Sequence, residues 1–152
     1  PPASLNHDMK KLFLAALGLA VGLGVAPAQQ IITGSLVSGT LTVTNGVTLS
    51  VNGPGFNLHP ARGLAVLPAF SADAADTSTI TFAFDVSHDG STWTTTGGLT
   101  GTGTLNGTNA VRNLILLAPT ALDNVKQVRL RSVQNGGTNT VTVTAVVGSY
   151  LR

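Results

Sequence analysis

Residues 84–93, with the sequence FDVSHDGSTW, gather most of the groups in this chain that could do chemistry. They include two aspartates, two serines, a histidine and the only tryptophan. Asp85, Ser87 and Asp89 stand at positions one, three and five of a stretch whose sixth residue is glycine, as oxygen ligands do at the start of a calcium-binding loop. Such a loop between helices also needs an acidic residue at position twelve, where this chain has Thr96. A calcium site therefore rests on two local carboxylates.

A turn between two strands is the simpler interpretation of the same residues. Asp89 can accept hydrogen bonds from the backbone amides that follow it, and Gly90 can adopt the left-handed conformation of a tight turn. Trp93 would then lie on the returning strand, next to the apolar face of residues 80–86. We favour the turn and keep the calcium loop as the alternative; no other cofactor is expected.

No group of residues meets the geometric requirements of a catalytic site. The G-x-S-x-G motif that presents a nucleophilic serine is absent. His88 and Asp89 are neighbours, so on a strand their side chains would point to opposite faces. The aspartates outside residues 84–93 show no pattern typical of the paired carboxylates of glycosidases. The sequence therefore predicts a protein that is not an enzyme and has no catalytic residues.

Two arginines form a second candidate binding group, together with Trp93. Arg129 and Arg131 are two residues apart, so on a strand they share one face, opposite Val128 and Leu130. They could hold an acidic partner or a polyanionic sugar. They could equally keep the outer face of a sheet soluble and prevent pairing between edges, and this second interpretation is favoured because two charges form only a small patch.

From residue 29 onward, apolar residues alternate with Thr and Ser at the period of two that marks β-strands. Asn45-Gly46 favours a type I′ turn and predicts a hairpin over 40–51. Pro68 predicts a bulge or an edge in the strand 63–70. The other predicted strands are 78–87, 91–96, 99–105 (glycine-rich and expected at an edge), 110–119, 124–134 and 138–152.

The composition agrees with an all-β protein. The 152-residue chain contains no glutamate and no cysteine, and only 9% of its residues are charged, against about 25% in ordinary soluble domains. A net charge of +2 is too small to indicate nucleic acid as a partner. We predict one antiparallel β-sandwich of about eight strands, jelly-roll or immunoglobulin-like, over residues 29–152.

The first part of the chain has a different character. Residues 9–28 comprise a positive start, an apolar run over 12–25 and the small-residue pattern Ala-Pro-Ala, which together are typical of a signal peptide. The expected cleavage lies between Ala28 and Gln29. The apolar run is shorter than the roughly 20 residues needed to cross a bilayer, so no membrane association is expected after processing. Residues 1–8 form an extension of unclear origin.

Two motifs carry a resemblance to a known group of proteins. The pattern F-x-F-D-V-S-x-D-G-S-T-W-T, followed by V-K-Q-V-R-L-R-S-V-Q-N-G-G-T-N-T-V-T-V, resembles small β-sandwich proteins of tailed-phage virions and their relatives in bacterial genomes. The similarity covers roughly residues 63–150. It implies a non-enzymatic building block such as a capsid decoration protein, a minor virion protein or a surface-layer module. The export-like N-terminus departs from the phage pattern.

These observations predict a structural protein, secreted or on a virion surface, that associates with copies of itself or docks on a larger protein lattice. A sandwich with little charge and weakly protected edges favours strand addition or flat packing between copies, so a homo-oligomer is expected. The alternative is a secreted bacterial module that binds a ligand such as carbohydrate.

Overall fold

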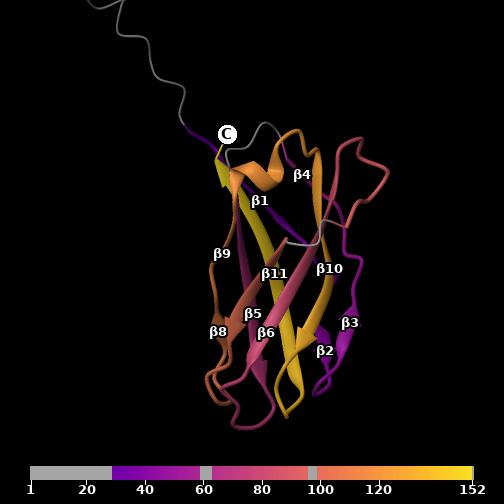
Figure 1. The fold of residues 1–152 in the computed structure, drawn as a ribbon. Coiled ribbons are helices and arrows are strands. Elements are labelled where there is room, and N and C mark those ends of the chain that lie inside the picture. The colour runs from indigo at the N-terminus through magenta and orange to yellow at the C-terminus, as the bar shows by residue number, and fades with distance from the viewer. Residues whose placement is uncertain (1–28, 59–62, 96–98, 152) are drawn as a thin grey trace, which may run out of the picture.

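The computed structural model describes residues 29–58, 63–95 and 99–151, and these form a two-layered β-sandwich (Figure 1). They contain eleven strands, one 3₁₀ helix and no α-helix, which confirms the predicted all-β antiparallel sandwich. No helix in these ranges is long and apolar enough to cross a membrane. The elements are β1 (Ile31–Ser35), β2 (Leu41–Val43), β3 (Thr48–Ser50), β4 (Phe56–Asn57), β5 (Leu64–Ala72), β6 (Thr79–Ser87), β7 (Thr100–Thr104), β8 (Val111–Arg112), β9 (Ile115–Leu117), the 3₁₀ helix η1 (Pro119–Leu122), β10 (Gln127–Asn135) and β11 (Val141–Leu151).

Each sheet has two long central strands with shorter strands along its edges. In the six-stranded sheet, β11 and β5 are central, β1 and β2 follow one another along the outer edge of β11, and β8 and β9 do so along β5. In the five-stranded sheet, β10 and β6 are central, with β3 and β4 beside β10 and β7 beside β6. Three of the four edge positions are therefore made of two short strands. The eleven strands differ from the eight or so predicted because β1 and β4 were not predicted and residues 110–119 form two strands, whereas the predicted strand 91–96 is wrong and reduces to an isolated bridge at Thr94.

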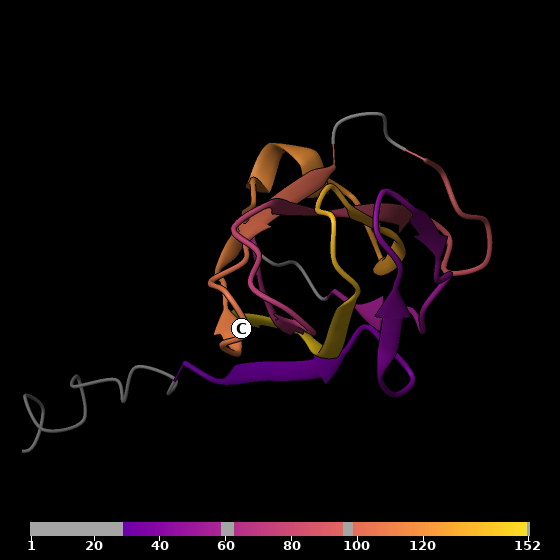
Figure 2. The same ribbon diagram turned by 90° about the horizontal axis from the view of Figure 1, so that it is seen from below.

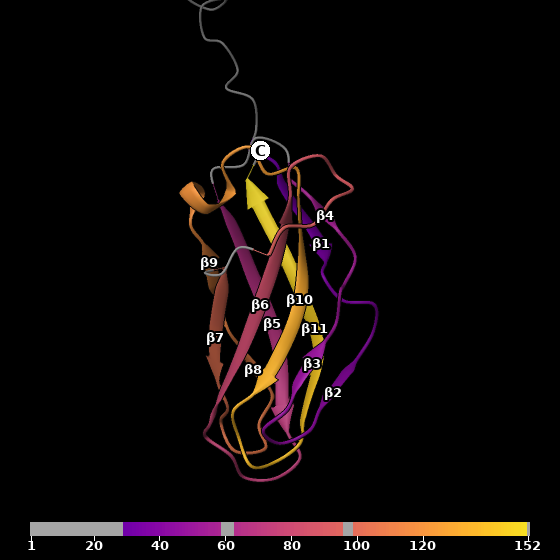
Figure 3. The ribbon, with the colours of Figure 1, turned by 45° about the vertical axis from the view of Figure 1, so that its right-hand side comes forward.

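Consecutive strand positions lie in different sheets, except for β6 and β7, which pair with each other, so the core needs both sheets. Figure 3 shows β7 and β9 along one side of the sandwich and β2 and β3 along the other. Seen from below, the two sheets surround the interior (Figure 2).

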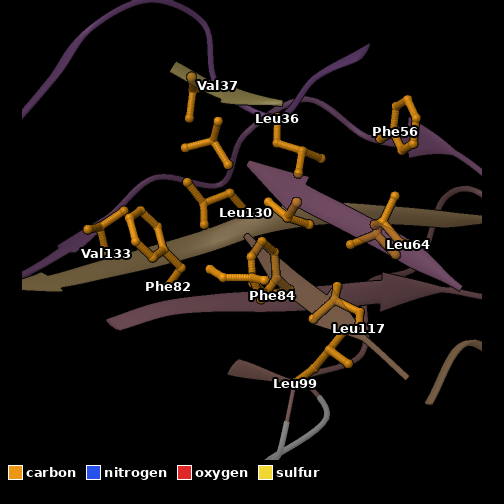
Figure 4. Close-up of a cluster of buried hydrophobic side chains, with 14 of the residues drawn as sticks. Leu36, Val37, Phe56, Leu64, Phe82, Phe84, Leu99, Leu117, Leu130 and Val133 are labelled. Atoms are coloured by element: carbon orange, nitrogen blue, oxygen red, sulfur yellow. The ribbon is translucent and has the colours of Figure 1, made fainter. Parts of the chain in front are cut away.

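The core lies between β6 and β10 on one side and β5 and β11 on the other. Ile80, Phe82, Phe84 and Val86 are at most 1% exposed, which confirms that alternate residues of this strand face the core. Val128 and Leu130 are fully buried from β10. Figure 4 shows how the side chains of this cluster fit together, among them Phe82, Phe84, Leu130 and Val133 from the five-stranded sheet and Leu64 and Leu117 from the other.

The predicted hairpin over residues 40–51 is wrong. β2 pairs with β11 and β3 pairs with β10, so the two strands enter different sheets and the Asn45-Gly46 turn connects the layers. Of the two turn residues, only Gly46 has a positive φ, at 67°, whereas a type I′ turn requires positive φ at both. Alternating residues show that a segment is half-buried, and they do not show which strand it pairs with.

The irregularity expected at Pro68 is confirmed. β5 is central rather than at an edge, and both of its neighbours are interrupted beside this proline. The register with β11 shifts between Val143 and Ala145, and on the other side β8 ends before β9 begins. A proline has no amide hydrogen to donate, so a continuous ladder through this position would lack a bond.

The glycine-rich segment expected at an edge forms β7, which pairs only with β6. Its glycines let the other sheet come close: a Cβ on Gly103 would lie 2.5 Å from the ring of Phe70, and one on Gly101 would overlap Ile115. The predicted strand 110–119 is divided into β8 and β9. Between them, the side-chain amide of Asn113 donates a hydrogen bond to the Thr102 carbonyl of β7 over 2.8 Å.

A polar network joins three connections at the lower end of the molecule in Figure 1. Asn135 is fully buried and donates to the carbonyls of Val43 and Asn139 over 3.1 and 2.7 Å. Asp76, from the connection between β5 and β6, accepts hydrogen bonds from the amides of Ser78 at 2.8 Å and Thr138 at 3.2 Å. Hydrogen bonds from Ser78 are the main cause that lowers the pKa of Asp76 from 3.8 to about 2.

This network predicts a loss of stability in acid. Because the folded-state pKa of Asp76 is depressed, its contribution is fully present above the unfolded value and is lost as the pH falls through about 2. We expect Asp76→Asn to be less stable than wild type near neutral pH and to lose less further stability on acidification, since the amide takes up no proton. Urea denaturation across this pH range measures both effects. Asp73→Asn, on the exposed part of the same connection, is the matched control, and equal acid sensitivity of wild type and Asp76→Asn would contradict the assignment.

Candidate functional site

Asp85 lies at the centre of the main polar cluster, on the outer face of the five-stranded sheet. The β6–β10 register places it directly opposite Arg129. Its side chain is only 4% exposed, and one carboxylate oxygen accepts hydrogen bonds from Arg129 at 3.0 Å (Nη2) and 3.3 Å (Nε). The other oxygen accepts a hydrogen bond from Thr95 at 3.2 Å and lies 3.8 Å from Nε of Arg131. Both oxygens are thus occupied by neighbouring side chains.

Arg129 and Arg131 share the outer face of β10, as predicted, while Val128 and Leu130 point into the core. The two arginines are not equivalent. Arg129 makes the short contacts to Asp85, and its side chain is 20% exposed; Arg131 is farther from Asp85 and 35% exposed. Asp85 therefore balances one of the two positive charges within the sheet, chiefly that of Arg129.

Trp93 does not lie beside the phenylalanine face of β6, where the sequence predicted it. Its ring lies on the opposite, outer face, with the guanidinium carbon of Arg129 4.5 Å from the ring centroid. A Cβ on Gly55 would lie 3.1 Å from the indole, so the connection from β3 to β4 also approaches it. A cation over an aromatic face is attracted by the ring quadrupole. One face of the only tryptophan is therefore occupied by Arg129, which leaves less of the ring for stacking on a sugar.

The turn after β6 has the geometry predicted for it. Gly90 has a φ of 88°, and Oδ1 of Asp89 accepts hydrogen bonds from the amides of Ser91 and Thr92, both at 2.7 Å. The Ser87 hydroxyl donates to the same oxygen over 3.0 Å. These bonds, that from Ser91 first, lower the pKa of Asp89 well below its usual value. Pairing with β6 then resumes through an isolated bridge between Val86 and Thr94.

The side chains of Asp85, Ser87 and Asp89, the candidate calcium ligands, make different contacts. Asp85 faces the arginines on the outer face of the sheet, whereas Ser87 and Asp89 bond to each other within the turn. In the described ranges, no group of three or more His, Cys, Asp or Glu side chains could hold a metal ion.

An apolar hollow on the outer face of the six-stranded sheet is the candidate site that the sequence analysis missed. It has a volume of about 560 Å³ and lies where β1, β11, β5 and β9 meet. Its rim carries Ile31, Leu116 and Leu151, which are 66%, 72% and 56% exposed. Ala65 and Ser149, which are paired with each other, are the small outward residues between these rims. The lining residues include none with a charge.

A signal for this face was present in the sequence. β2 and the first half of β11 alternate apolar residues with Thr, but Leu114 to Leu117 are four apolar residues in succession. In the structure Ile115 and Leu117 are buried, while Leu114 and Leu116 are 57% and 72% exposed. A strand that is apolar on both faces is typically buried on both faces. In this protein only the inner face of β9 is buried, so its outer face is apolar and exposed.

The expected cleavage site is described only in part. Gln29 is the first described residue, and Ala28, together with the predicted segments 1–8 and 9–28, lies outside the described residues. Every strand of both sheets lies after Gln29, the first being β1.

No protein-family model matches the sequence, and no curated protein matches it. Among solved structures, the chain is similar to one titled as the structure of infectious bursal disease virus Gx strain, with a TM-score of 0.48 and 11% identity over 86% of this chain and 36% of that chain. A structure of the Gt strain of the same virus gives a TM-score of 0.42, 10% identity and coverage of 82% and 33%.

A third similar structure is described as Bacillus endospore appendages that form a family of disulfide-linked pili. Its TM-score is 0.32, with 9% identity over 80% of this chain and 88% of that chain. The chain thus spans about a third of the length of the two virus proteins it matches.

The cluster around Asp85 predicts an asymmetry between its two arginine partners. We expect Asp85→Ala to lower the free energy of unfolding by about 2–3 kcal/mol, since it leaves two partly buried cations without a counter-charge. Arg131→Gln should cost less than about 1 kcal/mol, because its contact is longer and more exposed. Urea denaturation measures the stability of these variants. Wild type, Asp85→Ala, Arg129→Met and the double variant Asp85→Ala/Arg129→Met form a double-mutant cycle for the Asp85–Arg129 pair. An Asp85→Ala protein as stable as wild type would refute this account of the cluster.

Proposed function

We propose that the protein is a non-enzymatic structural subunit that associates with copies of itself or docks on a larger protein lattice. The observation that carries this proposal is the exposed apolar face of the six-stranded sheet, where Ile31, Leu116 and Leu151 surround an uncharged hollow. Contiguous exposed apolar surface is disfavoured on soluble monomers and usually marks an interaction site. The outward positions elsewhere are dominated by Thr, Ser and Asn, so this face is a local exception in a chain with little charge.

The polar clusters support a structural role rather than chemistry on a ligand. The carboxylates of Asp76, Asp85 and Asp89 each accept hydrogen bonds from the protein itself. Each of these arrangements stabilises a turn or joins two strands. The guanidinium of Arg129 is likewise shared between Asp85 and the ring of Trp93. The groups that could bind a substrate are therefore already engaged in holding the sandwich together.

The way the strands are connected supports a jelly roll as the finer description of the fold. When the two-part edges are counted as single positions, the six-stranded sheet has the order 1-8-3-6 and the five-stranded sheet 2-7-4-5. Apart from β6 and β7, which are neighbours in one sheet, successive segments then cross from one sheet to the other, in the pattern of two interleaved Greek keys. The edges are short or interrupted, and the Thr102 carbonyl of β7 is occupied by Asn113. Flat packing of faces is therefore favoured over strand addition at edges.

We place the working protein outside the cell or on a virion surface, with residues 1–28 removed. The resemblance to tailed-phage virion proteins favours a virion, while the export-like segment favours a surface filament or layer. Because β1 begins at Ile31, cleavage between Ala28 and Gln29 would remove no strand of the sandwich. We expect the intact mass of protein taken from its native source to correspond to a chain that begins at Gln29. A mass that includes Met9 would contradict cleavage there.

Association is tested on the purified protein. We expect sedimentation velocity over a concentration series to show species larger than the monomer, and electron microscopy of concentrated samples to show regular particles, sheets or filaments. The expectation follows from the apolar face, so high salt should favour assembly rather than dissolve it. A protein that remains monomeric at all concentrations and binds no lattice from its native source would refute the proposed function.

A further inference from the structure

We propose that the outer face of the six-stranded sheet packs against the same face of a second copy, so that Leu116 of each copy enters the hollow over Ala65 and Ser149 of the other. This inference rests on the proposed function and names its contact. It begins from the order of outward residues across the sheet. The registers place Thr33, Ser149, Ala65 and Leu116 in one row across β1, β11, β5 and β9.

In this row, one long exposed side chain (the projection) stands next to two short ones (the depression). Leu116 is 72% exposed, whereas its neighbours Ala65 and Ser149 have short side chains that are partly covered. Adjacent strands are about 4.8 Å apart, so the projection and the middle of the depression are separated by roughly 5–10 Å. A two-fold axis in the plane of the interface, parallel to the strands and between these points, places each Leu116 over the depression of the other copy. A closed two-fold contact requires this kind of self-complementary surface.

The charge distribution favours a copy of the chain over a charged partner. The lining of the hollow has no charged residue, so the hollows of two copies meet without repulsion; Arg112 of the same sheet pairs with Ala69, outside this lining. The charged side chains Asp85, Arg129 and Arg131 belong to the outer face of the other sheet. An acidic or basic partner would find no counter-charge within the hollow.

The size of the face sets the expected strength of the contact. Three rows across four strand positions cover roughly 20 Å by 20 Å, or about 400 Å² per copy. A standard stable interface buries about 800 Å² per partner, so one such contact forms a weak, concentration-dependent pair. Weak pair contacts are suited to a lattice, because several of them act together on each subunit.

Cysteine cross-linking tests the geometry directly, because the chain has no cysteine of its own. The single variants are Leu116→Cys and Ser149→Cys. The two variants are mixed under mild oxidation, once as full chains and once as chains that begin at Gln29. The expected result is a disulfide-linked heterodimer from the mixture. The control mixture is Val47→Cys with Ser149→Cys, since Val47 is exposed on the turn between β2 and β3, outside this face. The inference is overturned if the two mixtures cross-link equally.

Sedimentation of Leu116→Asp separates this inference from the proposed function. We expect the dissociation constant of the pair to rise about tenfold or more, because the carboxylate would be buried without a partner. Val47→Asp should associate like wild type. If Leu116→Asp assembles normally, the proposed function stands and this contact is wrong. If wild type does not assemble, this contact is wrong, and the proposed function fails as well if the protein binds no lattice from its native source.

Alkylation of the full-length Leu116→Cys variant distinguishes a second copy from the chain's own N-terminal segment. We expect the introduced thiol to react freely in dilute protein and to become protected as the concentration rises. If the full chain stays monomeric and this thiol is protected at every concentration, the N-terminal segment covers the face, and the second copy is excluded.

Discussion

Burial of one apolar face of β6 and β10 against β5 and β11 is the interaction on which the rest of the molecule depends. Phe82, Phe84 and Leu130 are all fully buried between the layers. Neither sheet can hide these side chains alone, and successive strand positions, apart from β6 and β7, lie in different sheets. The sandwich must therefore form as a unit. The short edge strands contribute little pairing of their own and are held by the central strands and by contacts across the layers.

The outer faces of the two sheets then acquire different characters. On the five-stranded sheet, the strand that carries Leu130 inward carries Arg129 outward, opposite Asp85, and the ring of Trp93 contacts the Arg129 guanidinium. That face carries charged side chains that contact one another, Asp85 balancing one of the two arginines. On the six-stranded sheet, Leu116 and Ile31 point outward without charged neighbours in the hollow. The same sandwich thus has one face completed by the chain itself and one whose exposed apolar residues another surface can cover.

The central strands could be predicted from the sequence because their alternation is long and strict. Phe82, Phe84, Val128 and Leu130 all have the predicted orientation, and the turn at Gly90 has the predicted left-handed conformation. The hairpin over residues 40–51 could not be predicted correctly, because period-two alternation shows burial and not pairing. The prediction for Trp93 was wrong for a related reason: the residues after Asp89 leave the sheet before Thr94 returns to it. The partnership of Asp85 with Arg129 depends on a register between distant strands, which no local pattern encodes.

The central claim is that the protein works by covering the outer face of its six-stranded sheet with another copy. Hydroxyl-radical footprinting of the dilute and the assembled protein tests it most directly, since it reports the exposure of individual side chains. The account predicts that Leu116, Leu151 and Ile31 become protected on assembly, while Val47 and Trp93 keep the reactivity of the monomer. Protection of Trp93 with unchanged reactivity of Leu116 would place the contact on the opposite sheet and contradict the account.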